Sequence, residues 1–97
     1  MTVIAWVPDL MDRSRFPPGV EFVTDPARLS EPADLVIIDL ARLPSLEVLG
    51  SIVAPTVGFA PHVDGDLAEA ARQAGCDDVL ARSVFFRRVA DIVSGAG

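Results

Sequence analysis

The chain contains no lysine, tyrosine or asparagine, and all of its basic residues are arginines. Codon bias in a GC-rich genome explains this composition, but the missing lysine also has a chemical consequence. No side-chain amine is available as a Schiff-base nucleophile, a proton shuttle or a point-charge ligand for phosphate. The sequence therefore excludes enzymes that depend on such a group.

Cysteine and histidine each occur once, as Cys76 and His62. A single cysteine excludes a disulfide within the chain, and beside Gly75 it is interpreted as a small buried hydrophobe. One histidine without paired cysteines gives no transition-metal site. Because a Ser-His-Asp spacing and a glycine-rich phosphate loop are also missing, we predict that the protein is not an enzyme.

Positive charge is scarce as well: the formal net charge is −6, and no basic cluster exceeds the pair Arg87-Arg88. A nucleic-acid partner requires a basic face and is excluded. The longest apolar stretch, residues 49–61, is too short to cross a bilayer and is broken by prolines. The first residues lack the pattern of a signal peptide. We expect a single cytoplasmic domain over residues 1–97, without a membrane partner.

What the sequence does contain is an alternation of strand and helix patterns. Runs of β-branched and apolar residues predict strands over 2–7, 20–24, 35–39, 55–60 and 79–81. Helices are predicted in the connections, over 9–16, 44–52, 66–74 and 84–93, with a loop or a single turn over 25–32. Such alternation predicts a parallel sheet with helices on both faces.

Two of the connections have informative details. Residues 8–19 are close to the minimum of about 10–12 residues for a crossover between parallel strands, so the first helix is expected to be short. In the helix over 66–74, Asp66 and Glu69 have the spacing of a capping box. Gly75 is expected to end that helix, and Ser83 is expected to cap the last one. The predicted apolar stripe consists of Leu67, Ala70, Ala71 and Ala74.

Asp39 ends the most apolar segment of the chain, Leu35-Val36-Ile37-Ile38-Asp39. A central parallel strand has this composition when it carries an acid to the carboxyl edge of a sheet. Ligands bind at that edge in open α/β sheets. The other candidate pocket residues follow or end predicted strands: Asp9, Ala60, His62 and Arg82.

Residues 33–52, 55–64 and 74–85 resemble the third, fourth and fifth strand segments of the receiver domain of bacterial response regulators, which belong to two-component systems. The resemblance covers nearly the whole chain. It implies the flavodoxin-like (βα)5 fold, which has three layers and a five-stranded parallel sheet of order 2-1-3-4-5. It also implies that Asp39 occupies the phosphoacceptor position of a signal-transduction module.

The chain departs from the receiver pattern where the chemistry resides. The acidic pair expected after the first strand is reduced to Asp9, the hydroxyl residue expected after the fourth is Ala60, and the expected lysine is Arg82. Magnesium prefers several carboxylate oxygens, and Asp9 and Asp39 supply few. The chain thus resembles a degenerate receiver, or pseudo-receiver, in which an Arg82–Asp39 ion pair would hold the pocket in one state.

Several residues keep alternative interpretations. Asp39 is a structural acid that pairs with Arg82 or caps a neighbouring loop, a surviving phosphoacceptor, or part of an unrelated ligand site. Asp9 is either a helix N-cap or a magnesium ligand. His62 is a loop residue or a switch that protonates near pH 6.5.

The last helix carries an unusually broad apolar stripe, and two adjacent phenylalanines are not expected to point fully inward together. The stripe is interpreted either as core or as a partner face, and the resemblance implies dimerisation through this surface. The residues predicted for the interface are Phe85, Phe86, Val89 and Val93.

We predict a stand-alone pseudo-receiver that acts by protein–protein contact or as a homodimer, without catalysis and without a cofactor. One alternative is a single-domain receiver that is phosphorylated on Asp39 with Mg²⁺. Another is a flavodoxin-like module that binds a small ligand.

Overall fold

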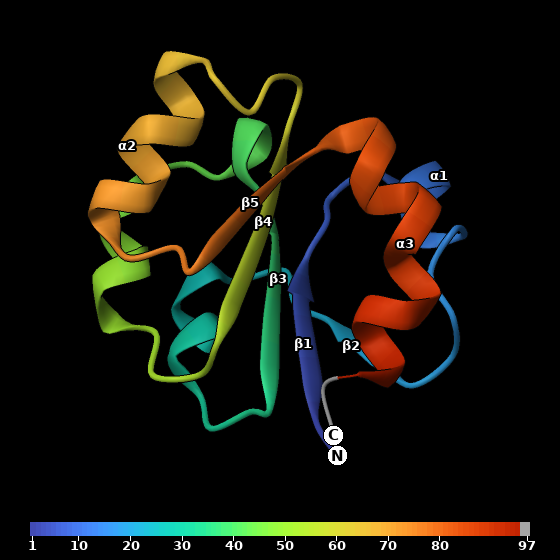
Figure 1. Cartoon of the computed structure of the whole chain (residues 1–97). Coiled ribbons are helices and arrows are strands. Elements are labelled where there is room, and N and C mark those ends of the chain that lie inside the picture. The colour runs from blue at the N-terminus through green and yellow to red at the C-terminus, as the bar shows by residue number, and fades with distance from the viewer. Residues whose placement is uncertain (96–97) are drawn as a thin grey trace.

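A five-stranded parallel sheet forms the centre of the computed structural model, which describes residues 1–95 (Figure 1). Its strand order is β2-β1-β3-β4-β5, and every neighbouring pair is parallel, so the predicted flavodoxin-like sheet is confirmed. The strands are β1 (Val3–Trp6), β2 (Val20–Phe22), β3 (Leu35–Asp39), β4 (Thr56–Ala60) and β5 (Asp78–Ala81).

Helices complete the three layers: α2 lies on one face of the sheet and α3 on the other (Figure 1). Most of the remaining connections are 3₁₀ rather than α-helical, as is common in short connecting pieces. Within residues 1–95, no helix has both the length and the apolar character needed to cross a membrane. The helices are α1 (Leu10–Arg13), α2 (Asp66–Ala74), α3 (Arg82–Ser94), and the 3₁₀ helices η1 (Pro26–Ser30), η2 (Leu40–Arg42) and η3 (Leu46–Ser51).

The first crossover contains a single helical turn, shorter than the predicted range over 9–16. Asp9 is the N-cap of α1: its Oδ1 accepts hydrogen bonds from the backbone amides of Met11 (2.8 Å) and Asp12 (3.2 Å). These bonds satisfy amide groups that the short helix leaves without a carbonyl partner. The N-cap interpretation of Asp9 is confirmed.

Helix α2 has its predicted extent but not its predicted cap, and its predicted apolar stripe is confirmed at three of four residues. Gly65 is the N-cap and no side chain caps the helix, so the Asp66–Glu69 capping box is wrong. Ala71 is buried, and Leu67 and Ala74 are half-buried against the same core cluster, as predicted; Ala70 is exposed, and Ala68 is buried instead. Gly75 ends the helix with a φ of 122°, as predicted.

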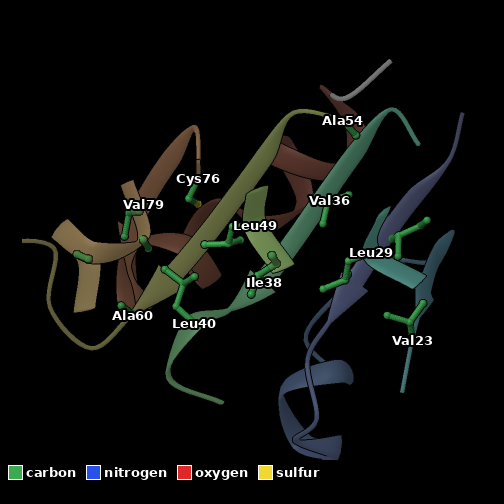
Figure 2. Close-up of a cluster of buried hydrophobic side chains, with 13 residues drawn as sticks. Val23, Leu29, Val36, Ile38, Leu40, Leu49, Ala54, Ala60, Cys76 and Val79 are labelled. Atoms are coloured by element: carbon green, nitrogen blue, oxygen red, sulfur yellow. The ribbon is translucent and has the colours of Figure 1, made fainter. Parts of the chain in front are cut away.

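The core has two parts, one on each face of the sheet, and β3 contributes to both. Val36 and Ile38 pack in the cluster that Figure 2 shows, while Leu35 and Ile37 pack in the cluster beneath α3. This alternation follows the two-residue period of a strand that is covered on both sides. Cys76 belongs to the first cluster and is 4% exposed, so its interpretation as a small hydrophobe is confirmed.

The predicted partner face on α3 is wrong, because its residues are buried in the second cluster. Their exposed fractions are 0% for Phe85, 7% for Phe86, 6% for Val89 and 6% for Val93.

Two adjacent phenylalanines can both be buried because the first crossover covers the second ring. Phe85 stacks on Phe59 of the sheet with ring centroids 4.6 Å apart. Phe86 also contacts Phe59, and its ring meets Phe16 edge-on at 5.8 Å. The Arg15 guanidinium lies 4.1 Å from the Phe86 centroid. Residues after α1 therefore supply a wall that helical periodicity alone does not reveal.

The N-terminus of α3 also differs from the prediction. The helix begins at Arg82, its N-cap is Ala81, and no side chain caps it, so the predicted Ser83 cap is wrong. The last strand leads directly into the helix, which places Arg82 at the carboxyl edge of the sheet.

Candidate functional site

Asp39 lies at the carboxyl end of β3, next to Phe59 in the register of β4. The residue is only 3% exposed, and its Oδ2 atom is buried without a hydrogen-bond partner among residues 1–95. Burial without hydrogen bonds disfavours the ionised form of a carboxyl group. Desolvation accordingly raises the pKa of Asp39 above its ordinary value of 3.8, although the positive charges of Arg42 and Arg82 oppose the shift.

Arg42 reaches back over the Asp39 carboxylate because η2 begins directly after β3. Residues three apart lie on one side of a 3₁₀ helix, which brings the two side chains together. Arg42 Nε lies 3.7 Å from Asp39 Oδ2, and Arg42 Nη2 lies 3.6 Å from Asp9 Oδ2. These separations are ion pairs rather than hydrogen bonds. Arg42 thus bridges the two acids that the sequence predicted for the pocket.

The predicted Arg82–Asp39 ion pair is wrong, because Arg82 binds Asp12 instead. Arg82 Nη1 donates a hydrogen bond to Asp12 Oδ2 (2.8 Å), and Nη2 donates to Oδ1. A carboxylate that offers both oxygens matches the planar guanidinium fork. Helix α1 presents such a carboxylate, whereas that of Asp39 is recessed in the sheet. The Arg82 guanidinium also lies 5.0 Å from the centroid of Phe86, which fixes its direction.

Asp12 is itself 5% exposed, and Arg82 is the cation that balances its charge. The hydrogen bonds to Asp12 raise the pKa of Arg82 above its ordinary value. Asp12 and Arg82 are 70 residues apart in the sequence, so this pair joins α1 to the start of α3.

The other predicted pocket residues have simpler surroundings. Asp9 has its pKa lowered by hydrogen bonds from the amides of Asp12 and Met11. Ala60 is buried and offers no hydroxyl group at the end of β4. His62 is exposed in the loop that follows, and within residues 1–95 its side chain makes no hydrogen bond or ion pair. The structure therefore brings Asp9 and Asp39 together through Arg42 and leaves His62 outside this cluster.

The donor atoms at this edge do not fit Mg²⁺, which the receiver resemblance implies. Asp9 Oδ1 accepts two amide hydrogen bonds, and both oxygens of Asp12 accept from Arg82. Asp9 Oδ2 and Asp39 Oδ2 face the Arg42 guanidinium. Among the residues that the structure describes, no group of three or more His, Cys, Asp or Glu side chains is arranged to hold a metal ion. Cationic side chains occupy the position that a hard divalent cation would need.

The arrangement also includes two residues that the predicted pocket omitted, Arg42 and Asp12. The spacing Asp-x-x-Arg from 39 to 42 is a signal for Arg42, provided that the residues after the strand form a 3₁₀ turn. No comparable local signal exists for Asp12, because its partner is distant in the sequence.

A solved structure of a response regulator from Hahella chejuensis has the same architecture. The TM-score is 0.72 with 22% sequence identity, over 98% of this chain and 93% of that chain. The fold is that of a receiver domain. No protein-family model and no curated protein matches the sequence. On the receiver fold, the carboxyl edge holds Asp39 at the end of β3, Ala60 at the end of β4 and Arg82 just after β5.

Proposed function

We propose that this chain is a receiver-like signalling module that acts in the cytoplasm through protein–protein contact, as a pseudo-receiver without phosphotransfer or other catalysis. The observation that carries the proposal is the pairing of acids with arginines at the carboxyl edge. Arg42 lies against Asp9 and Asp39, and Arg82 binds Asp12.

Phosphoryl transfer to a carboxylate needs an accessible ionised oxygen and cations that neutralise the developing charge on the phosphoryl group. The Asp39 side chain is 4% exposed, and burial favours its neutral form. The end of β4 supplies no hydroxyl, and Arg82 is already engaged by Asp12. These features support a pocket whose charge is balanced within the protein and needs no metal.

A second candidate function is phosphorylation of Asp39, and one observation favours it. Asp39 Oδ2 is a buried polar atom without a hydrogen bond, and such atoms are uncommon and frequently functional. The Arg42 side chain is 55% exposed, so it can leave the carboxylate without disturbing the core. A phosphoryl donor would then reach an oxygen that has no competing hydrogen bond.

Intact-protein mass spectrometry distinguishes the two candidates. The protein is incubated with Mg²⁺ and acetyl phosphate, alongside Asp39→Asn and the exposed-loop control Asp64→Asn. We expect no phosphoryl adduct on any of the three proteins. A stoichiometric adduct on the wild type and Asp64→Asn, but not on Asp39→Asn, would overturn the pseudo-receiver proposal.

The proposed partner is another protein or a second copy of this chain. The α3 residues Phe85 and Phe86 do not supply the contact surface, because they are buried. Exposed apolar side chains do follow the N-cap Asp9 of the acidic cluster, which consists of Asp9, Asp12 and Asp39. They are Leu10 (74% exposed) and Met11 (80% exposed) on α1. Sedimentation velocity over a range of concentrations tests self-association. If the chain forms a homodimer, its boundary should sediment faster at high concentration, and Leu10→Asp should slow it to the rate of the monomer. If the chain sediments as a monomer at all concentrations, the partner is another protein.

A further inference from the structure

A pocket of about 240 Å³ opens where β1 and β2 end, beside the acidic cluster. It follows from the short first crossover: α1 has a single turn and leaves the carboxyl ends of these strands partly uncovered. Neither the pseudo-receiver proposal nor phosphorylation of Asp39 uses this pocket. Its lining residues are Trp6, Pro8, Arg13, Val23 and Thr24.

Arg13 is the charged residue of this pocket, and its guanidinium is held in place. Its Nε donates a hydrogen bond to the carbonyl of Val7 (2.6 Å), and its guanidinium lies 5.3 Å from the centroid of Phe22. Within residues 1–95, its Nη1 and Nη2 groups make no hydrogen bond and no ion pair. A partly buried guanidinium with fixed orientation and free terminal donors is suited to a carboxylate, which it can bind through two hydrogen bonds.

The remaining walls are mostly apolar. Trp6 is half-buried, and its indole Nε1 donates to the carbonyl of Arg42 (3.2 Å), which fixes the orientation of the ring. Pro8 and the buried Val23 add aliphatic contacts, and Thr24 adds a hydroxyl group at the exposed rim. A planar aromatic ring fits such walls because it buries apolar area and can pack against the indole.

We propose that this pocket binds a small planar aromatic carboxylate, with its ring against Trp6, Pro8 and Val23 and its carboxylate on Arg13. The volume lies below the range of about 300–1,000 Å³ for drug-sized ligands, which favours a molecule of one or two rings over a nucleotide. A single cation among the lining residues favours a monoanion over a phosphate ester. The proposal is independent of the proposed function, because Asp39 takes no part in it.

Sodium benzoate is a suitable probe, and benzamide is its uncharged counterpart of the same shape. Backbone-amide and indole N–H chemical shifts are followed by NMR during a titration of the wild type. We expect saturable shifts at Trp6, Arg13, Val23 and Thr24 with benzoate. Benzamide should bind at least about tenfold more weakly, because a charge-assisted hydrogen bond contributes more than a neutral one.

The matched variants are Arg13→Gln and Arg88→Gln, the latter on the exposed side of α3. Arg13→Gln should weaken benzoate binding by about tenfold or more, and Arg88→Gln should leave it unchanged. Circular dichroism checks that both variants fold. If Arg13→Gln does not fold, the comparison of benzoate with benzamide on the wild type still tests the role of the ligand's charge. Equal affinities for benzoate and benzamide, saturable shifts confined to other residues, or no saturable shift at all would overturn the proposal.

Discussion

Asp12 and Asp39 are both buried acids at one edge of the sheet, but their charges are balanced differently. Asp12 accepts two hydrogen bonds from Arg82, whereas Asp39 faces Arg42 across 3.7 Å without a hydrogen bond at Oδ2. A fully hydrogen-bonded ion pair stabilises the ionised acid, while an incompletely paired one leaves the desolvation of the charge uncompensated. Removal of the charge should therefore raise the free energy of unfolding at Asp39 and lower it at Asp12.

Asp39→Asn is expected to stabilise the protein at pH 7. Burial raises the folded-state pKa of Asp39 above its unfolded value of 3.8. The protonated residue therefore contributes its full share to the free energy of unfolding below pH 3.8, and this share is lost as pH rises through the raised pKa. The neutral amide avoids that loss. Urea unfolding should give a higher midpoint for Asp39→Asn at pH 7, with the gain shrinking toward pH 3.8. Asp64→Asn is the exposed control. A lower midpoint at pH 7 would mean that attraction to Arg42 outweighs desolvation.

Arg82→Gln is expected to destabilise the protein by about 1–3 kcal/mol, because it leaves the buried Asp12 carboxylate without its charged donor. Asp12→Asn alone should also be destabilising. The double variant should lose less than the sum of the two, with a coupling energy of about 0.5–3 kcal/mol. Guanidinium unfolding of the four proteins measures this cycle, and Arg88→Gln serves as the surface control. Additive losses would show that the pair contributes little beyond its separate contacts.

The identity of these partners shows where sequence reasoning reaches its limit. That Asp39 would end a buried strand follows from the apolar residues before it. The sequence also predicted that an arginine would balance the charge of Asp39. The predicted partner was Arg82, whereas the structure places Arg42 there. The choice depends on the 3₁₀ turn of η2 and on the position of Asp12 relative to α3. The spacing from Asp39 to Arg42 indicates the correct partner only once the turn is known to be 3₁₀, and no local pattern indicates the position of Asp12.

At the scale of elements, η2 is held tightly against β4. Gly58 in β4 has no room for a side chain: a Cβ atom there would lie 2.6 Å from Leu40 Cδ1 and 3.1 Å from Cys76 Sγ. Leu40 is 2% exposed and cannot move outward easily. Because Arg42 is the last residue of η2, the packing of η2 on the sheet also positions its side chain against the Asp39 carboxylate.

Gly58→Ala is therefore expected to destabilise the protein by about 1–3 kcal/mol, the usual cost of overpacking a core. Gly50→Ala is the matched control, because a Cβ atom there meets nothing within 4 Å. Gly50 lies in η3 without a positive φ, so alanine should be neutral or slightly stabilising there. Thermal unfolding measures both variants. A loss at Gly58 no larger than that at Gly50 would show that Leu40 and Cys76 accommodate the methyl group.

The sequence predicted the strands and the two long helices well and the short helical turns poorly. The range of β3 was predicted without error, and β4 and α3 within two residues, because long apolar runs and helical periodicity are strong signals. The loop or single turn predicted over 25–32 contains η1, whereas η2 was not predicted, since a turn of three residues has too few positions for periodicity to appear.

At the scale of the molecule, the sheet separates two clusters of buried side chains, and α3 covers one of them. Phe16 from the first crossover packs against this cluster beside Phe85 and Phe86. A stunted α1 thus leaves length for residues 14–16 to pack over the C-terminal helix. Because of this long-range contact the α3 stripe is part of the core and not a partner face. The α3 sequence alone does not predict the contact.

The burial of this stripe leads to a prediction for stability that separates core from surface. Phe85→Ala should lower the free energy of unfolding by about 3–5 kcal/mol, because the ring is fully buried and stacks on Phe59. Met11→Ala should change it by less than about 0.5 kcal/mol, since Met11 is 80% exposed. A domain near the lower end of the usual range of about 5–15 kcal/mol would survive the first change only marginally. Chemical unfolding followed by Trp6 fluorescence measures both variants. If Phe85→Ala instead unfolds like the wild type, Phe85 is not packed against Phe59 in solution, and the α3 stripe returns as a candidate contact surface.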